Sequence, residues 1–230
     1  STAVLKGSQL CAALAGWHWE CSPAARTMGA TSSALIDELH TASTLPDAVA
    51  RKVKVLRAVQ EHARSAEVSI QLVEQNGLQP LTRCYNAPHP TVRIEAAKAL
   101  AVVARQPANQ LDMGLDDVLP HLVLPLLTGD AELKEHAMAT LALISRPEQN
   151  KMKLVHEGLL GTIIEEISSR QVPLQRAAIS ALEQIMQVPQ VSVLAAQRGA
   201  MFQRRKAARS DDDAVKIATL RAMVSLASAP

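Results

Sequence analysis

The sequence predicts an all-α solenoid, and two observations support this fold class. An apolar pattern recurs every 41 residues, and within each copy its positions are separated by 4, 4 and 3 residues. This spacing places them on one face of an α-helix. A period near 40 is typical of helical repeats, in which each unit buries its apolar face only against its neighbours. The rows are Val92, Leu133, Leu174 and Val215; Ala96, Ala137, Ala178 and Thr219; Leu100, Leu141, Leu182 and Met223; and Val103, Ile144, Ile185 and Leu226.

The composition narrows the class of protein. The 230 residues carry a net charge of +2, with 20% charged and 2% aromatic residues. This balance does not indicate a nucleic-acid or membrane binder, and few aromatic rings are present on which single-stranded bases could stack. No apolar run reaches the roughly 18–20 residues that a membrane span needs. Three cysteines without a disulfide framework favour a reducing, intracellular compartment.

Residues 1–34 are expected to form an N-terminal arm. The segment contains a single acid, Glu20, and many Ser, Thr and Ala residues, a composition that resembles an organellar leader and suggests a mitochondrial location. The sequence does not begin with methionine, so we interpret the segment as an arm retained after methionine excision or leader cleavage. Trp17 and Trp19 supply half of the aromatic residues and are predicted to anchor the arm on a partner.

Residues 35–230 are expected to form one repeat domain. Helices at 32–42 and 46–63 fit the 41-residue period badly and are interpreted as a degenerate terminal pair. Repeats of three helices follow at about 64–106, 107–147, 148–189 and 190–230. In each, a short first helix is expected to end at a glycine, and the third helix to end near a proline. These are Gly77, Gly114, Gly158 and Gly199, and Pro107, Pro147, Pro189 and Pro230.

The third helices are expected to begin at proline or at a capping side chain. Pro90 and Pro173 stand at two helix starts, where the missing proline N–H costs little. Asp130 and Ser210 are expected to cap the other two. Ser210 is followed by three aspartates, which suit the positive end of a helix dipole.

These units resemble the armadillo repeat. The segments LVEQNGLQPL (72–81) and LVHEGLLGTI (154–163) look like its opening, and RIEAAKALAVVA, KEHAMATLALIS and QRAAISALEQIM look like its third helix. The resemblance covers about 64–230 and implies a right-handed α-solenoid of about four three-helix repeats plus the degenerate N-terminal pair. HEAT repeats, which have two helices per unit, are the neighbouring alternative.

The chain departs from the armadillo pattern at one row. Importin-alpha adaptors and catenins carry an asparagine in the third helix, understood to hold the backbone of an extended peptide in the concave groove. The matching positions here are Val102, Leu143, Gln184 and Ser225. The resemblance therefore implies the scaffold and not extended-peptide recognition.

Motifs for catalysis and metal binding are missing from the sequence. It contains no phosphate-binding, dinucleotide-binding, nucleophile-elbow or zinc-protease motif, and its seven histidines are scattered. Cys11, His18 and Cys21 lack the paired spacing and the fourth ligand of a zinc site. We predict neither an enzyme, nor a cofactor, nor a metal centre.

The C-terminal repeat carries the strongest candidates for partner binding. In the last expected helix, about 212–228, Ile217, Leu220 and Val224 form a second apolar stripe beside the repeating row, and no further repeat follows to cover it. We expect this stripe to contact another subunit, because contiguous exposed apolar surface marks interfaces. Arg204 and Arg205, within the basic cluster 198–209, are candidates for its polar rim. The cluster itself fits either a solvated face or a patch for an acidic protein, RNA or anionic lipid.

Two function classes follow from the sequence. The first, which the Trp-bearing arm and the missing asparagine row favour, is a non-catalytic structural subunit of a large assembly. An organellar respiratory, ATP-synthase or ribosomal complex would fit, with any membrane association peripheral and through the complex. The second is a soluble armadillo adaptor that binds a peptide or nucleic acid on its concave face.

Overall fold

The computed structural model describes residues 28–45, 48–115 and 118–188, together with residues 191, 213 and 216. These residues form α-helices and turns, with no strand among them. The helices are α1 (Met28–Thr44), α2 (Val49–His62), α3 (Ala66–Glu74), α4 (Leu78–Tyr85), α5 (Pro90–Val103), α6 (Pro107–Leu115), α7 (Val118–Thr128), α8 (Ala131–Ile144), α9 (Glu148–His156), α10 (Leu159–Glu166) and α11 (Val172–Ile185). The predicted all-α solenoid is confirmed.

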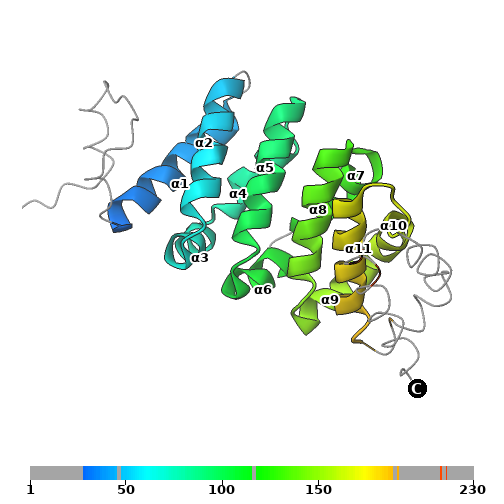
Figure 1. Ribbon diagram of the computed structural model, residues 1–230. Coiled ribbons are helices and arrows are strands. Elements are labelled where there is room, and N and C mark those ends of the chain that lie inside the picture. The colour runs from blue at the N-terminus through cyan, green and yellow to red at the C-terminus, as the bar shows by residue number, and fades with distance from the viewer. Residues whose placement is uncertain are drawn as a thin grey trace, which may run out of the picture.

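Each described repeat contributes one helix to each of three rows (Figure 1). The first helices α3, α6 and α9 pack in sequence, and so do the second helices α4, α7 and α10. The third helices α5, α8 and α11 make the most extensive contacts between repeats. Helix α1 packs on α4, and α2 packs on α5, so the pair occupies the places of a second and a third helix. This confirms three helices per unit and a degenerate N-terminal pair whose members correspond to a second and a third helix.

Small residues permit close packing along the third-helix row. Ala96, Ala137 and Ala178 are fully buried, as predicted from their 41-residue spacing. Leucines one turn later, including Leu100 and Leu141, are also fully buried. The predicted helical phase is therefore correct.

The ends of the third helices follow the predicted chemistry. Pro90 is the first residue of α5, and Pro173 lies in the first turn of α11. Asp130 caps α8, where its Oδ1 accepts a hydrogen bond of 2.9 Å from the backbone N–H of Leu133. Ser210, the other expected cap, lies outside the described residues.

The glycines act differently from the prediction at two of the three described positions. Gly158 follows the end of α9 as predicted, and its φ of +77° makes a left-handed turn there. Before α4, however, the positive φ of +59° belongs to Asn76, and Gly77 has ordinary helical φ and ψ. Gly114 is buried inside α6 and does not end it. A β-carbon on Gly114 would overlap the carboxamide of Asn150. Glycine is therefore required at position 114 because it leaves room for this side chain.

One helix boundary also differs from expectation. Helix α1 begins at Met28, within the expected arm, and not at residue 32. Helix ends are set by local capping as well as by periodicity, so pattern alone fixes them poorly.

Buried asparagines join the first-helix row to the rest of the solenoid. The Asn109 Nδ2 donates to the backbone oxygen of Ser69 on α3 at 3.0 Å and to that of Val103, the last residue of α5, at 3.3 Å. The Asn150 Nδ2, 41 positions later, donates to the backbone oxygens of Gln110 at 2.7 Å and Ile144 at 2.8 Å. Each amide thus ties a repeat to two helices of the preceding one. We call this pair the amide ladder.

None of the described helices combines the length and the apolar character that a membrane-spanning helix needs.

Candidate interaction face

The residues predicted to bind partners cannot be placed. All seven lie outside the described residues: Trp17, Trp19, Arg204, Arg205, Ile217, Leu220 and Val224. They remain predictions, as does the basic cluster at 198–209. The described surface offers a different candidate, the outward side of α2, α5, α8 and α11, which lie in one row in Figure 1. We call it the third-helix face.

The positions that match the armadillo asparagine lie on this face. Val102, Leu143 and Gln184 are each partly buried, and Val102 and Leu143 rest against the hydrophobic core. Ser225, the fourth such position, lies outside the described residues. At two of its repeats the face therefore presents aliphatic side chains where the peptide-binding family members present an amide.

Polar side chains connect the first three helices of the face. Glu95 of α5 is only 7% exposed, and its carboxylate accepts hydrogen bonds from Gln60 at 2.7 Å and from Arg57 at 3.3 Å, both on α2. Gln60 also donates to the backbone oxygen of Glu95 at 3.0 Å. Lys98, one turn further along α5, lies 2.7 Å from Glu132 of α8 and 4.0 Å from Glu95. These five residues form the charged network.

The members of the charged network differ in what they contribute. Glu132 is about half exposed, and an ion pair such as Lys98–Glu132 typically contributes about 0–1 kcal/mol. Glu95 is almost wholly buried, so its hydrogen bonds are of the kind that contribute about 1.5–3 kcal/mol to a charged group. The network therefore fixes α2 on α5 more firmly than α5 on α8.

His136 of α8 lies at the end of the charged network. Desolvation lowers its pKa, Glu135 opposes this shift, and Lys98 adds to it. Near neutral pH the ring is therefore held uncharged, because its burial disfavours the imidazolium form.

The face changes character toward α11. The positions that Glu95 and Lys98 hold in α5 are held in α11 by Ala177 and Ser180, 82 residues later. Both are partly buried, and Ala177 packs on the core. At these positions the face between α8 and α11 therefore presents small, uncharged side chains. Beside it lies the charged network, whose acids Glu95 and Glu132 are already paired.

Sequence reasoning missed both the charged network and the amide ladder. A signal for the ladder exists in the sequence, since Asn109 and Asn150 stand 41 residues apart, but the prediction rests on apolar rows only. Glu95 also directly precedes Ala96 and Ala97 in an alanine-rich helix, which is a cue for a buried polar contact. Within the described ranges, no group of three or more His, Cys, Asp or Glu side chains could hold a metal ion.

Solved structures with the same arrangement of helices include designed proteins. A computationally designed armadillo repeat protein for modular peptide recognition matches with a TM-score of 0.78 at 19% identity, over 86% of this chain and 82% of that one. A designed armadillo repeat protein in complex with the peptide (KR)4 matches with a TM-score of 0.74 at 20% identity, over 86% and 82%. An engineered protein matches with a TM-score of 0.72 at 22% identity, over 87% and 91%.

Comparison at the level of sequence gives no such match. No protein-family model matches the sequence, and no curated protein matches it significantly. The structural matches show that the chain has the armadillo-repeat fold.

Proposed function

We propose that this protein is a non-catalytic scaffold subunit of a large multiprotein assembly, and that it acts through protein–protein contacts. The observation that carries the proposal is the row of Val102 and Leu143 on the third-helix face, beside the small residues of α11. Protein interfaces combine an apolar centre with a polar rim. Here the aliphatic row would supply the centre, and the charged network would supply part of the rim.

The second candidate is a soluble adaptor that binds a peptide or nucleic acid on the same face. One of the designed proteins with this fold is complexed with a (KR)4 peptide. A basic peptide needs carboxylates that can accept its charges, but Glu95 and Glu132 already contact Arg57 and Lys98. Binding would have to displace these intramolecular partners. The charged network therefore favours the scaffold over the adaptor.

Further contacts belong to the same proposal. Trp17 and Trp19 would anchor the N-terminal arm, because tryptophan offers a large contact area with one polar group. Ile217, Leu220 and Val224 would form a second docking stripe, with Arg204 and Arg205 at its rim. The leader-like composition of residues 1–34 supports an organellar assembly, such as a respiratory, ATP-synthase or ribosomal complex.

The mass of the native protein in an extract of its own source tests the proposal. The chain alone has a mass of 24.7 kDa, and we expect it to migrate with a much larger complex. Migration near the mass of the single chain would contradict the scaffold function and favour the adaptor.

A pair of variants then tests the face. Leu143→Glu places a charge in the aliphatic row, and Leu127→Glu places the same charge on α7, where the side chain is already 55% exposed. Both chains should remain helical and fold cooperatively. We expect the Leu143 variant to fail to enter the complex and the Leu127 variant to enter it normally. Normal entry of a folded Leu143 variant would show that the third-helix face is not the contact.

The docking stripe has its own test. Leu220→Glu combined with Val224→Glu should leave the chain folded, reduce its tendency to aggregate and prevent its incorporation. Unimpaired incorporation of this double variant would exclude the stripe while leaving the third-helix face in place.

A further inference from the structure

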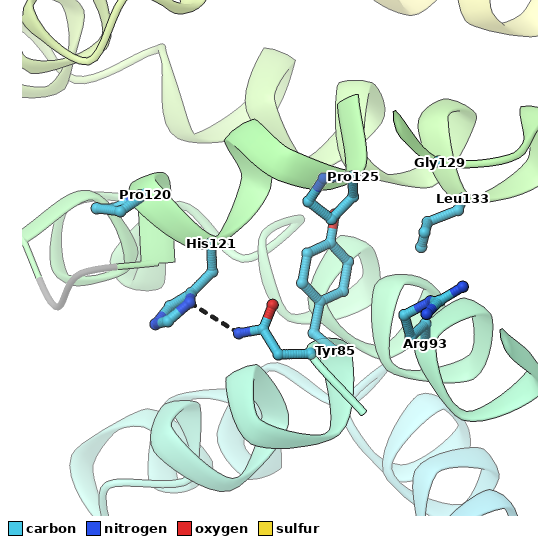
Figure 2. Close-up of a pocket in the computed structure, with 8 residues that line it drawn as sticks. Tyr85, Arg93, Pro120, His121, Pro125, Gly129 and Leu133 are labelled. Atoms are coloured by element: carbon cyan, nitrogen blue, oxygen red, sulfur yellow. Dashed lines mark hydrogen bonds between the residues drawn. The ribbon is translucent and has the colours of Figure 1, made fainter. Parts of the chain in front are cut away.

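A cavity of about 460 Å³ lies at the turns between second and third helices (Figure 2). Side chains from the end of α4, the start of α5, helix α7 and the start of α8 line it. The residues that matter for its chemistry are Tyr85, Asn86, Arg93, His121, Pro125 and Leu133. Among the described residues that line it, none is an acid.

Tyr85 is the least expected member of this group. Its side chain is fully buried, and its hydroxyl has no hydrogen-bond partner among the described residues. In Figure 2 the ring extends from α4 toward Pro125 of α7. A buried hydroxyl without a partner destabilises a fold, and a group bound in the adjacent cavity would supply that partner.

Arg93 supplies a positive charge to the same cavity. Its Nη1 donates a long hydrogen bond of 3.4 Å to the backbone oxygen of Pro88. No carboxylate pairs with it in the part of the chain that the structure describes. The guanidinium therefore keeps donors for an incoming acceptor, and its planar fork matches a carboxylate.

Asn86 orients a third donor. Its Nδ2 lies 2.8 Å from the Nδ1 of His121, as the dashed line in Figure 2 shows. An amide nitrogen can only donate, so Nδ1 accepts and the proton of the neutral ring is on Nε2. His121 is thus a donor on its other side. Pro125 and Leu133 add apolar wall.

We propose that this cavity binds a carboxylate carried on a compact apolar body, with Arg93 pairing the carboxylate and the hydroxyl of Tyr85 donating to it. A carboxylate fits better than a phosphate, because a single cation and apolar walls suit one negative charge. Two sources share this chemistry: a small organic acid and the C-terminal carboxylate of a polypeptide. The site is independent of the proposed scaffold function.

Calorimetric titration of the full chain with 3-phenylpropanoate tests the site. A ligand of this size should bind with a Kd on the order of 1 mM. The neutral amide of the same acid should bind about tenfold more weakly, because it cannot pair with Arg93. Equal affinity for acid and amide, or no binding of either, would overturn the proposal.

Variants assign the binding to the named side chains. Arg93→Gln should weaken binding of the acid about tenfold, whereas Arg83→Gln, an exposed arginine of α4 that does not line the cavity, should leave it unchanged. Tyr85→Phe removes one atom and should weaken binding about fivefold without lowering the melting temperature. Unchanged affinity in folded Arg93→Gln or Tyr85→Phe chains would refute the assignment. Leu143→Glu, which tests the scaffold, should not affect this titration.

Titration with a peptide distinguishes a small organic acid from the C-terminal carboxylate of a polypeptide. A six-residue peptide that ends in leucine is titrated with its C-terminus either free or amidated. Tighter binding of the free peptide than of 3-phenylpropanoate supports the site as a receptor for a chain terminus. Binding of the small acid without binding of the free peptide supports the site as a receptor for an organic acid.

Discussion

Gly114 and Asn150 should be coupled energetically across two repeats. A methyl group at position 114 would occupy the place of the Asn150 carboxamide, which is held by hydrogen bonds to Gln110 and Ile144. The Gly114→Ala chain can accommodate the methyl only by moving that side chain and breaking those bonds. The double variant Gly114→Ala, Asn150→Ala removes the conflict, because no carboxamide remains to overlap.

The expected magnitudes follow from the contacts. Asn150→Ala removes two buried hydrogen bonds and should lower the free energy of unfolding by about 2 kcal/mol. Gly114→Ala should lower the free energy of unfolding by about 2 kcal/mol, because it displaces the Asn150 side chain. The higher helix propensity of alanine should offset about 1 kcal/mol of this loss. In the double variant the propensity gain remains and the overlap does not. The loss of unfolding free energy in the double variant should therefore be about 2 kcal/mol smaller than the sum of the losses in the two single variants.

Urea denaturation followed by far-UV circular dichroism measures these differences, with equal m-values as the requirement for comparison. Gln149→Ala, at the exposed neighbour of Asn150 on α9, is the matched control and should change stability by less than about 0.5 kcal/mol. It should also be additive with Gly114→Ala. Additivity of Gly114→Ala with Asn150→Ala would refute the reasoning, because it would mean that the two side chains do not compete for one space.

Three further predictions concern the other buried polar groups. Asn109→Ala should lower the free energy of unfolding by about 2 kcal/mol, since its buried carbonyl partners lose a donor; an unchanged urea midpoint would contradict the amide ladder. Glu95→Ala should lower the free energy of unfolding by about 2 kcal/mol, and Glu132→Ala should lower it by less than about 1 kcal/mol. Only the effect of Glu132→Ala should disappear in 1 M salt, because Glu132 is exposed and Glu95 is buried. Burial raises the pKa of Tyr85, so unfolded chains lose this proton near pH 10 while folded chains keep it. The free energy of unfolding should therefore fall above about pH 10. Tyr85→Phe should reduce the slope of this fall by up to about 1.4 kcal/mol per pH unit. If the two chains give parallel curves of unfolding free energy against pH, another group titrates.

The repeat architecture could be predicted because its signal is local. Ala96, Ala137 and Ala178 recur at one spacing, and a single amphipathic pattern determines both the helix and its buried side. The identity of the repeat followed from short motifs that contain the same positions. Fold class, helix phase and the number of helices per unit therefore needed no long-range information.

The polar contacts could not be predicted in the same way. Gly114 was interpreted as a helix terminator because glycine commonly ends helices, whereas its role depends on Asn150, 36 residues later. The cavity unites Tyr85, Arg93 and His121 from three helices, and their spacing follows no period. Such sites exist only once the backbone has folded, and one sequence gives no measure of which distant polar residues meet. The predicted docking residues at both ends lie outside the described part of the chain, so they stay predictions.

The amide ladder also separates two properties that are usually linked in a solenoid. Asn109 and Asn150 donate to backbone oxygens and not to apolar side chains, so they fix the offset between successive repeats without depending on the volume of the core. Exchanges among core leucines, isoleucines and methionines can then accumulate while the pitch of the superhelix is conserved. An insertion between α5 and α6 would do the reverse, since it moves the amide away from its carbonyls without altering a single core residue. Binding of a rigid partner to the third-helix face should therefore be impaired by such an insertion and unaffected by exchanges among core residues.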